Sequence, residues 1–224
     1  MVRSDNSRND NETFPLSDQR VAIFIDGSNL YHSLEENCGR YDLNFGAFTV
    51  KLTRSRTLFR AYYYNVLRDQ DRNAQAYQDQ QKFLAALYNT PYLEVRLGTS
   101  KVRGEVTVEK GVDIMIATDM LRLAWEDFYD IAVLVSGDGD FAYAVQTVKD
   151  IGKYVEIVAF QPNLSPDLLQ AADDWEFLSP EFFDDLWSRG RGRSSSSNGS
   201  GEGHKEKTRR GWRLGRIKSG RSER

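Results

Sequence analysis

The sequence has one cysteine and only two histidines, and this shortage excludes several kinds of functional site. Cys38 has no second cysteine in the chain with which to form a disulfide. A zinc site built from Cys and His side chains lacks ligands, because only His32 and His204 accompany that cysteine. A Ser–His–Asp triad would have one plausible base at most.

Long hydrophobic runs are also missing. No stretch approaches the roughly 20 apolar residues that a membrane-spanning helix needs. Residues 1–19 contain no hydrophobic stretch of the signal-peptide type. Because they are polar, we expect them to be disordered. These features predict a soluble, cytoplasmic protein.

Charge is distributed unevenly along the chain. Residues 189–224 hold twelve Lys and Arg and three Glu, which gives this tail a charge of +9. Because the whole chain carries −3, the remainder carries −12. The tail is also rich in Ser and Gly, which predicts a disordered basic arm that could contact nucleic acid.

Between these tails, apolar runs alternate with amphipathic segments, which predicts an α/β domain over residues 20–188. We expect a mainly parallel central sheet between two layers of helices. The predicted strands are 21–25, 57–66, 92–97, 131–135, 155–160 and 175–178. The predicted helices are 28–37, 71–90, 111–125, 141–151, 164–171 and 180–187, with a loop or short helix after the first and a loop or hairpin over 99–110.

Carboxylates follow two of the predicted buried strands. Asp26 comes after VAIFI, and Asp138 and Asp140 come after IAVLV. Because the carboxyl ends of parallel strands converge on one crevice, these acids can meet in space. Two carboxylates 5 Å apart repel by roughly 3 kcal/mol at an effective dielectric of 20, so such a cluster favours a bound divalent cation or shared protons.

Each motif also has an ordinary structural interpretation. Asp26 could simply cap the first helix, although Ser28 is the N-cap that we predict. Asn29 can hydrogen-bond a metal-bound water or a phosphate, or it can face solvent. His32 is better explained by packing or by a surface position. The aromatic residues Tyr31, Tyr62–Tyr64, Phe141 and Tyr143 are better explained by the core than by base stacking.

The segment KGVDIMIATDML supplies a further carboxylate. Asp113 falls in the first turn of the predicted helix, where the helix dipole alone would favour it. Asp119 is six residues later, about 120° round the helix, so we predict a supporting or structural role. Lys110 is a candidate contact for phosphate or an ordinary surface residue.

The order and spacing of three motifs resemble the LabA-like NYN domains of the PIN-like nuclease superfamily. These motifs are DGSN after the first strand, KGVD at the start of a middle helix and SGDGDF after a later strand. The resemblance covers roughly residues 20–178 and implies a three-layer, Rossmann-like PIN/NYN fold. It also implies a ribonuclease in which Asp26, Asp113, Asp138 and Asp140 hold Mg²⁺ or Mn²⁺, with Asn29 and Ser136 in support. Single-stranded RNA is the expected substrate.

Two other functions are compatible with the same residues. One is an RNA-binding or regulatory module that keeps the acids but has little catalytic activity. The other is a metal-dependent phosphatase acting on small phosphoesters. The second fits less well, because an aspartyl-phosphate enzyme would place its D-x-D motif directly after the first strand, where this chain has Asp26-Gly27-Ser28.

Overall fold

The computed structural model describes residues 18–71, 73–103 and 106–188, without the side chains of residues 100–110. The tail predicted over 189–224, and all but the last two residues of the segment predicted to be disordered at 1–19, lie outside the described residues. The described residues belong to one folded unit. None of their helices has the length and apolar character needed to cross a bilayer.

Strands and helices alternate along the chain, close to the predicted ranges. The strands are β1 (Arg20–Asp26), β2 (Thr57–Val66), β3 (Leu93–Arg103), β4 (Val106–Lys110), β5 (Ile131–Val135), β6 (Tyr154–Phe160) and β7 (Asp174–Leu178). The α-helices are α1 (Gly27–Cys38), α2 (Phe45–Thr53), α3 (Ala74–Tyr88), α4 (Val112–Trp125), α5 (Ala142–Asp150) and α6 (Pro166–Ala171). Short 3₁₀ turns occupy Gly139–Phe141, Gln161–Asn163 and Pro180–Phe183.

The seven strands form one sheet in the order β4-β3-β2-β1-β5-β6-β7. All neighbours are parallel except β3 and β4, which form an antiparallel hairpin over the segment predicted as a loop or hairpin. The predicted α/β class with a mainly parallel sheet is therefore confirmed, and the order is that of a Rossmann-like sheet extended by a hairpin.

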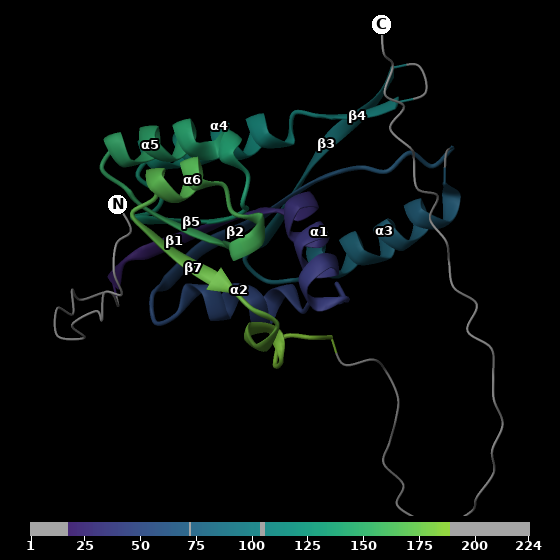
Figure 1. Cartoon of the computed structure of the whole chain (residues 1–224), viewed down its shortest axis with the longest axis horizontal. Coiled ribbons are helices and arrows are strands. Elements are labelled where there is room, and N and C mark those ends of the chain that lie inside the picture. Colours follow the sequence, from purple (N-terminus) through teal and green to yellow (C-terminus); the bar gives the residue numbers. More distant parts are fainter. Residues whose placement is uncertain (1–17, 72, 104–105, 189–224) are drawn as a thin grey trace, which may run out of the picture. The chain divides into compact units, whose positions relative to one another are not determined.

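Helices cover both faces of the sheet (Figure 1). Alternate residues of β1 point to opposite faces: Ile23 and Ile25 pack with α1, α2 and α3, whereas Ala22 and Phe24 pack with α4, α5 and α6. This two-sided burial explains why β1 and β5 are almost continuously apolar.

The start of α1 differs from the prediction. Asp26, and not Ser28, is the N-cap: its backbone is extended (φ −73°, ψ 99°) and its side chain accepts the N–H of Asn29. The sequence offers two good N-cap residues two positions apart, and the earlier one is used because β1 leads directly into the helix. The last residue of the strand is therefore also the cap of the helix.

Candidate functional site

The candidate site lies at the carboxyl ends of β1 and β5, the two central strands. The chain runs from β1 through α1 and β2 to one edge of the sheet, and from β5 through α5 and β6 to the other. In open α/β sheets the strand order reverses at such a point and leaves a crevice there, which is the usual place for a ligand.

Asp26 occupies the centre of this crevice and is only 5% exposed. Its Oδ1 accepts the backbone N–H of Asn29 at 3.1 Å, and its Oδ2 accepts the hydroxyl of Ser136 at 3.2 Å. One oxygen is thus held by α1 and the other by the loop after β5. The orientation of this carboxylate is fixed by the fold itself.

The loop after β5 is tied to the same point. The hydroxyl of buried Ser136 accepts the N–H of Asp138 at 3.2 Å, and the side-chain oxygen of Asn29 accepts the N–H of Gly137 at 3.2 Å. A Cβ at Gly137 would lie 1.9 Å from the carbonyl oxygen of Asn163, so glycine is needed where this loop meets the one after β6. These contacts place the Asp138 side chain beside Asp26.

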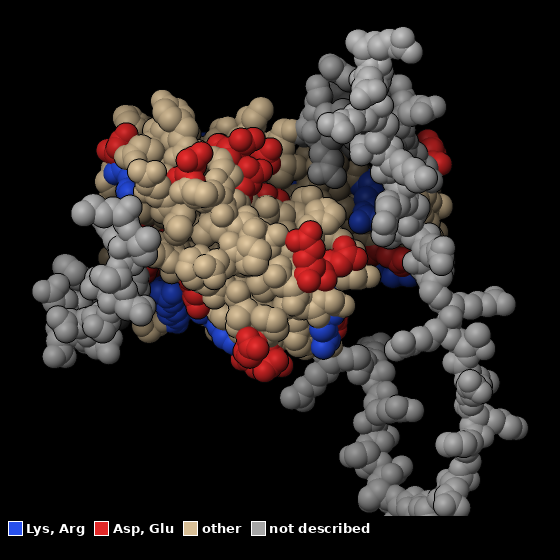
Figure 2. Space-filling model, viewed as in Figure 1, with Lys and Arg blue, Asp and Glu red and all other residues tan. Residues whose placement is uncertain are grey.

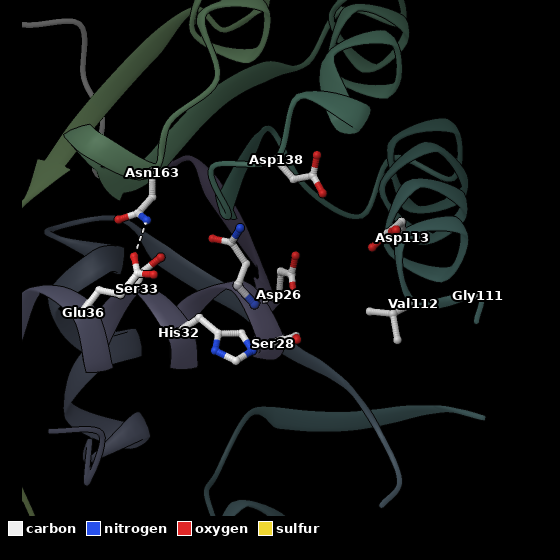
Figure 3. Close-up of a pocket in the computed structure, with 11 residues that line it drawn as sticks. Asp26, Ser28, His32, Ser33, Glu36, Gly111, Val112, Asp113, Asp138 and Asn163 are labelled. Carbon is white, nitrogen blue, oxygen red and sulfur yellow. Dashed lines mark hydrogen bonds between the residues drawn. The ribbon is translucent and has the colours of Figure 1, made fainter. Parts of the chain in front are cut away.

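Asp113 is brought to the site by the start of α4. Gly111 precedes the helix with φ 87°, a conformation that favours glycine, and Asp113 follows in the first turn. Figure 3 shows Asp113 facing the site from α4 and Asp138 from the loop after β5. Three of the predicted acids, from three separate segments, therefore line one pocket.

This pocket has a volume of about 380 Å³. Besides these acids and Asn29 it is lined by residues that the sequence did not predict as site residues: Ser28, His32, Ser33, Glu36, Gly111, Val112 and Asn163. The side-chain amide of Asn163 donates to Glu36 at 2.9 Å (Figure 3).

A signal for these residues was present in the sequence. Asn29, His32, Ser33 and Glu36 stand at positions i, i+3, i+4 and i+7, which is the pattern of a single helix face. Asn163 comes shortly after the carboxyl end of β6, the position that also predicted Asp26 and Asp138. The position of a polar residue just after a parallel strand therefore predicts Asn163 as a pocket residue too.

Burial, with a smaller contribution from neighbouring acids, raises the pKa of two of these carboxylates. Burial, opposed by hydrogen bonds and reinforced by repulsion from Asp113 and Asp138, raises the pKa of Asp26 from 3.8 to about 6. The pKa of Asp113 is raised by burial and by repulsion from Asp138 and Asp140. Negative charge is therefore costly in this pocket without a compensating cation.

The donor set has the chemistry that a hard divalent cation prefers, since every acidic ligand offers oxygen. Among the described residues, no three His, Cys, Asp or Glu side chains are close enough to hold a metal ion as a group. Mg²⁺ usually retains several waters and takes one or two carboxylates together with substrate phosphates. The pocket fits that mode of binding better than a closed cage of protein ligands.

The remaining predicted residues lie elsewhere. Asp140 is exposed at the start of the turn after β5; it does not line the pocket, although its charge acts on Asp113. Asp119 accepts the hydroxyl of Tyr64 at 2.9 Å and pairs with Arg96, so of its two predicted roles the structural one matches its contacts. Lys110 ends β4, and its side chain lies outside the described part.

The aromatic candidates divide into core and surface. Tyr62, Tyr63, Tyr64 and Phe141 are at most 3% exposed, which confirms the prediction that they belong to the core. Tyr143 is exposed on α5, so the prediction that it belongs to the core is wrong, and Tyr31 is half-buried on α1.

Acidic side chains form several patches on the face shown in Figure 2, and basic side chains lie toward its margins. This distribution agrees with the charge of −12 outside the tail. A polyanionic ligand would therefore need local positive charge at the pocket.

Comparison with known proteins agrees with the fold. The chain is 29% identical over 163 residues to the low amplitude and bright protein LabA of Synechococcus elongatus, an alignment that covers 69% of this chain and 81% of LabA. It is 35% identical over 97 residues to the uncharacterized protein y4oD of Sinorhizobium fredii, covering 41% of this chain and 44% of that protein.

A crystal structure of a protein of unknown function, VPA0982 from Vibrio parahaemolyticus, has the same fold. The TM-score is 0.61 at 23% identity, and the match covers 76% of this chain and 96% of that one. The NYN domain profile matches residues 20–181, a range that contains β1 and Asp26 as well as β5, Asp138 and every other residue of the pocket. The chain is thus a LabA-like member of the NYN domain family, within the PIN-like nuclease superfamily.

Proposed function

We propose that this protein is a metal-dependent ribonuclease that hydrolyses phosphodiester bonds of single-stranded RNA at the carboxylate pocket. The observation that carries the proposal is the meeting of Asp26, Asp113 and Asp138 in one pocket at the carboxyl ends of β1 and β5. Their mutual repulsion favours a cation, and a cation in turn allows a phosphate to approach an acidic surface.

One or two of Asp26, Asp113 and Asp138 would bind Mg²⁺ or Mn²⁺ directly, and the rest would bind it through its water molecules. Asp140 would act from the rim through its charge. When bound, such an ion neutralises the phosphodiester and lowers the pKa of a water molecule. Ser136 and the N–H of Asn29 keep the Asp26 oxygens in place.

Asn29 has a further role in this scheme. Its side-chain oxygen is occupied by Gly137, whereas its side-chain NH₂ has no hydrogen-bond partner within the described residues. That donor lines the pocket and would bind a phosphate oxygen. No Cys or His nucleophile is required.

The basic tail would add affinity without taking part in the chemistry. Its twelve Lys and Arg residues can contact phosphates that extend beyond the pocket. Each contact to a single strand contributes a slope of about −0.7 to the dependence of log affinity on log salt. Truncation after Ser188 is expected to reduce that slope by several units and to leave metal binding unchanged.

A second candidate is an RNA-binding regulatory module with little turnover. The observation in its favour is that no three acidic ligands stand together as a metal-binding group in the described part of the chain. Turnover distinguishes the two functions, because the module would bind RNA in a metal-dependent manner and leave it intact.

The test uses a labelled single-stranded RNA with Mg²⁺ or Mn²⁺, and compares the full-length protein with Asp26→Asn and Asp138→Asn. We expect cleavage by the wild type and a loss of about 100-fold or more in each variant. Asp184→Asn is the matched control, since Asp184 is exposed and does not line the pocket. Equal activity in all four proteins would refute the site, and intact RNA bound by the wild type would support the regulatory module.

A further inference from the structure

A second cavity of about 360 Å³ adjoins the carboxylate pocket across the first turns of α1. We call it the α1–α3 cavity. Ser28 and His32 belong to the walls of both cavities. The rest of the lining comes from α1, α2, the end of β2 and α3, with Tyr41 from the loop between α1 and α2 and Arg68 from the loop after β2. Its size lies within the range of small-molecule sites.

Aromatic rings form much of its wall. Tyr31 and Tyr41 lie against one another with ring centroids 4.7 Å apart. Deeper in the wall, Phe45, Tyr63 and Phe83 make edge-to-face contacts at 5.2–5.7 Å. These three rings support one another, whereas Tyr41 is 55% exposed and offers an open ring surface.

The polar groups of the cavity leave one cation available. Gln80 accepts the backbone N–H of Arg68 and donates to the carbonyl of Val66, so its amide is already occupied. Asp79 accepts hydrogen bonds from Gln75 and Lys82 on α3. The guanidinium of Arg68, by contrast, makes no ion pair or hydrogen bond with any residue that the structure describes.

An open aromatic surface beside an arginine that has no partner in the described part of the chain matches the chemistry of a nucleotide. Aromatic rings stack on the faces of unpaired bases, and the planar guanidinium binds phosphate through two parallel hydrogen bonds. Arg68 is exposed, and the chain outside the tail has a net negative charge. Its positive charge could therefore bind the phosphate next to a base that stacks on Tyr41.

We propose that the α1–α3 cavity binds an unpaired nucleobase of the RNA strand whose phosphate lies in the carboxylate pocket. This inference rests on the proposed function. Because Ser28 and His32 form the ridge between the two cavities, a strand can pass over it with a phosphate on one side and a base on the other. A base inside a duplex is paired and stacked, and cannot enter, so the cavity selects single strands.

The test measures binding of fluorescent RNA by full-length variants, with Ca²⁺ in place of Mg²⁺ and the RNA checked for integrity after each titration. Tyr41→Ala removes the exposed ring, and Arg68→Gln removes the cation. Tyr88→Ala and Arg60→Gln are matched controls, since both side chains are exposed or half-exposed and neither lines the cavity. Melting temperatures confirm that each variant is folded.

Two ligands separate base from backbone: a single-stranded oligonucleotide and the same sugar–phosphate chain without bases. We expect Tyr41→Ala to weaken binding of the oligonucleotide about tenfold and to leave binding of the abasic chain within about twofold of the wild type. Arg68→Gln should weaken both, and the control variants neither. An unchanged affinity of Tyr41→Ala for the oligonucleotide, or an equal loss on both ligands, would overturn the inference.

Two further measurements complete the design. A free mononucleotide that binds as tightly as the oligonucleotide would assign the cavity to a small ligand and overturn the proposal. Cleavage is followed in parallel with Mg²⁺. If the wild type does not cleave RNA but Tyr41→Ala still binds the oligonucleotide tenfold more weakly, the ribonuclease function is refuted and the base site is supported. If the wild type cleaves RNA and Tyr41→Ala binds the oligonucleotide as tightly as the wild type, only the base site is refuted.

Discussion

Replacing Asp26 by asparagine is expected to stabilise the metal-free protein at neutral pH. The pKa of Asp26 is raised from 3.8 to about 6, chiefly by burial. Between those two pH values the folded protein binds more protons at this position than the unfolded chain does, so the free energy of unfolding falls as the pH rises through that window. Above pH 6 the full cost of the buried charge is present.

The size of the effect follows from the shift. About two pKa units at 1.36 kcal/mol each give about 3 kcal/mol of destabilisation in the wild type at pH 8. Asparagine is as good an N-cap as aspartate, and its side-chain oxygen can still accept the N–H of Asn29. The substitution therefore removes the charge and keeps the helix cap.

The assay is urea unfolding in EDTA at pH 4 and pH 8. We expect Asp26→Asn to be more stable than the wild type by about 1–3 kcal/mol at pH 8 and by less than about 1 kcal/mol at pH 4. Asp184→Asn, at an exposed position, serves as the control and should match the wild type. A variant that is less stable than the wild type at pH 8, or a difference independent of pH, would show that Asp26 is not a strained buried charge.

Three other perturbations follow from the structure. Gly137→Ala should lower the free energy of unfolding by about 3 kcal/mol or more in urea melts, because the new Cβ would collide with the backbone of Asn163. Gly46→Ala is the control: its new Cβ would have no neighbour closer than 3.5 Å, so the free energy of unfolding should change by less than about 1 kcal/mol. Glu156→Gln should lower the free energy of unfolding by about 3–5 kcal/mol in the same assay. The buried guanidinium of Arg56 lies 2.5 Å from the Glu156 carboxylate, and the substitution removes its counter-charge. Calorimetry should show Mg²⁺ affinity falling about tenfold per pH unit below pH 6, where a proton competes for Asp26, and a flat profile would contradict that role.

The sequence predicted the fold well, because each element has a simple local cause. The continuous apolar runs at 21–25 and 131–135 are short and rich in β-branched residues, which predicts buried strands, and their ends identified Asp26 and Asp138. Strand order was not predictable, since it depends on which strand edges hydrogen-bond to one another, and the periodicity of a strand does not specify its neighbours. The same limit applies to Asp119, whose partners Tyr64 and Arg96 come from neighbouring strands that sequence alone does not place beside α4.

Asp26 also limits how its own site can change. An ionised carboxylate offers about four lone-pair positions, and the helix cap and the serine hydroxyl occupy two of them. A ligand at this residue has to use the two that remain, in a direction set before it arrives. Glutamate at position 26 would carry the charge one methylene farther and release the first turn of α1, so here the length of the side chain is constrained as strictly as its charge.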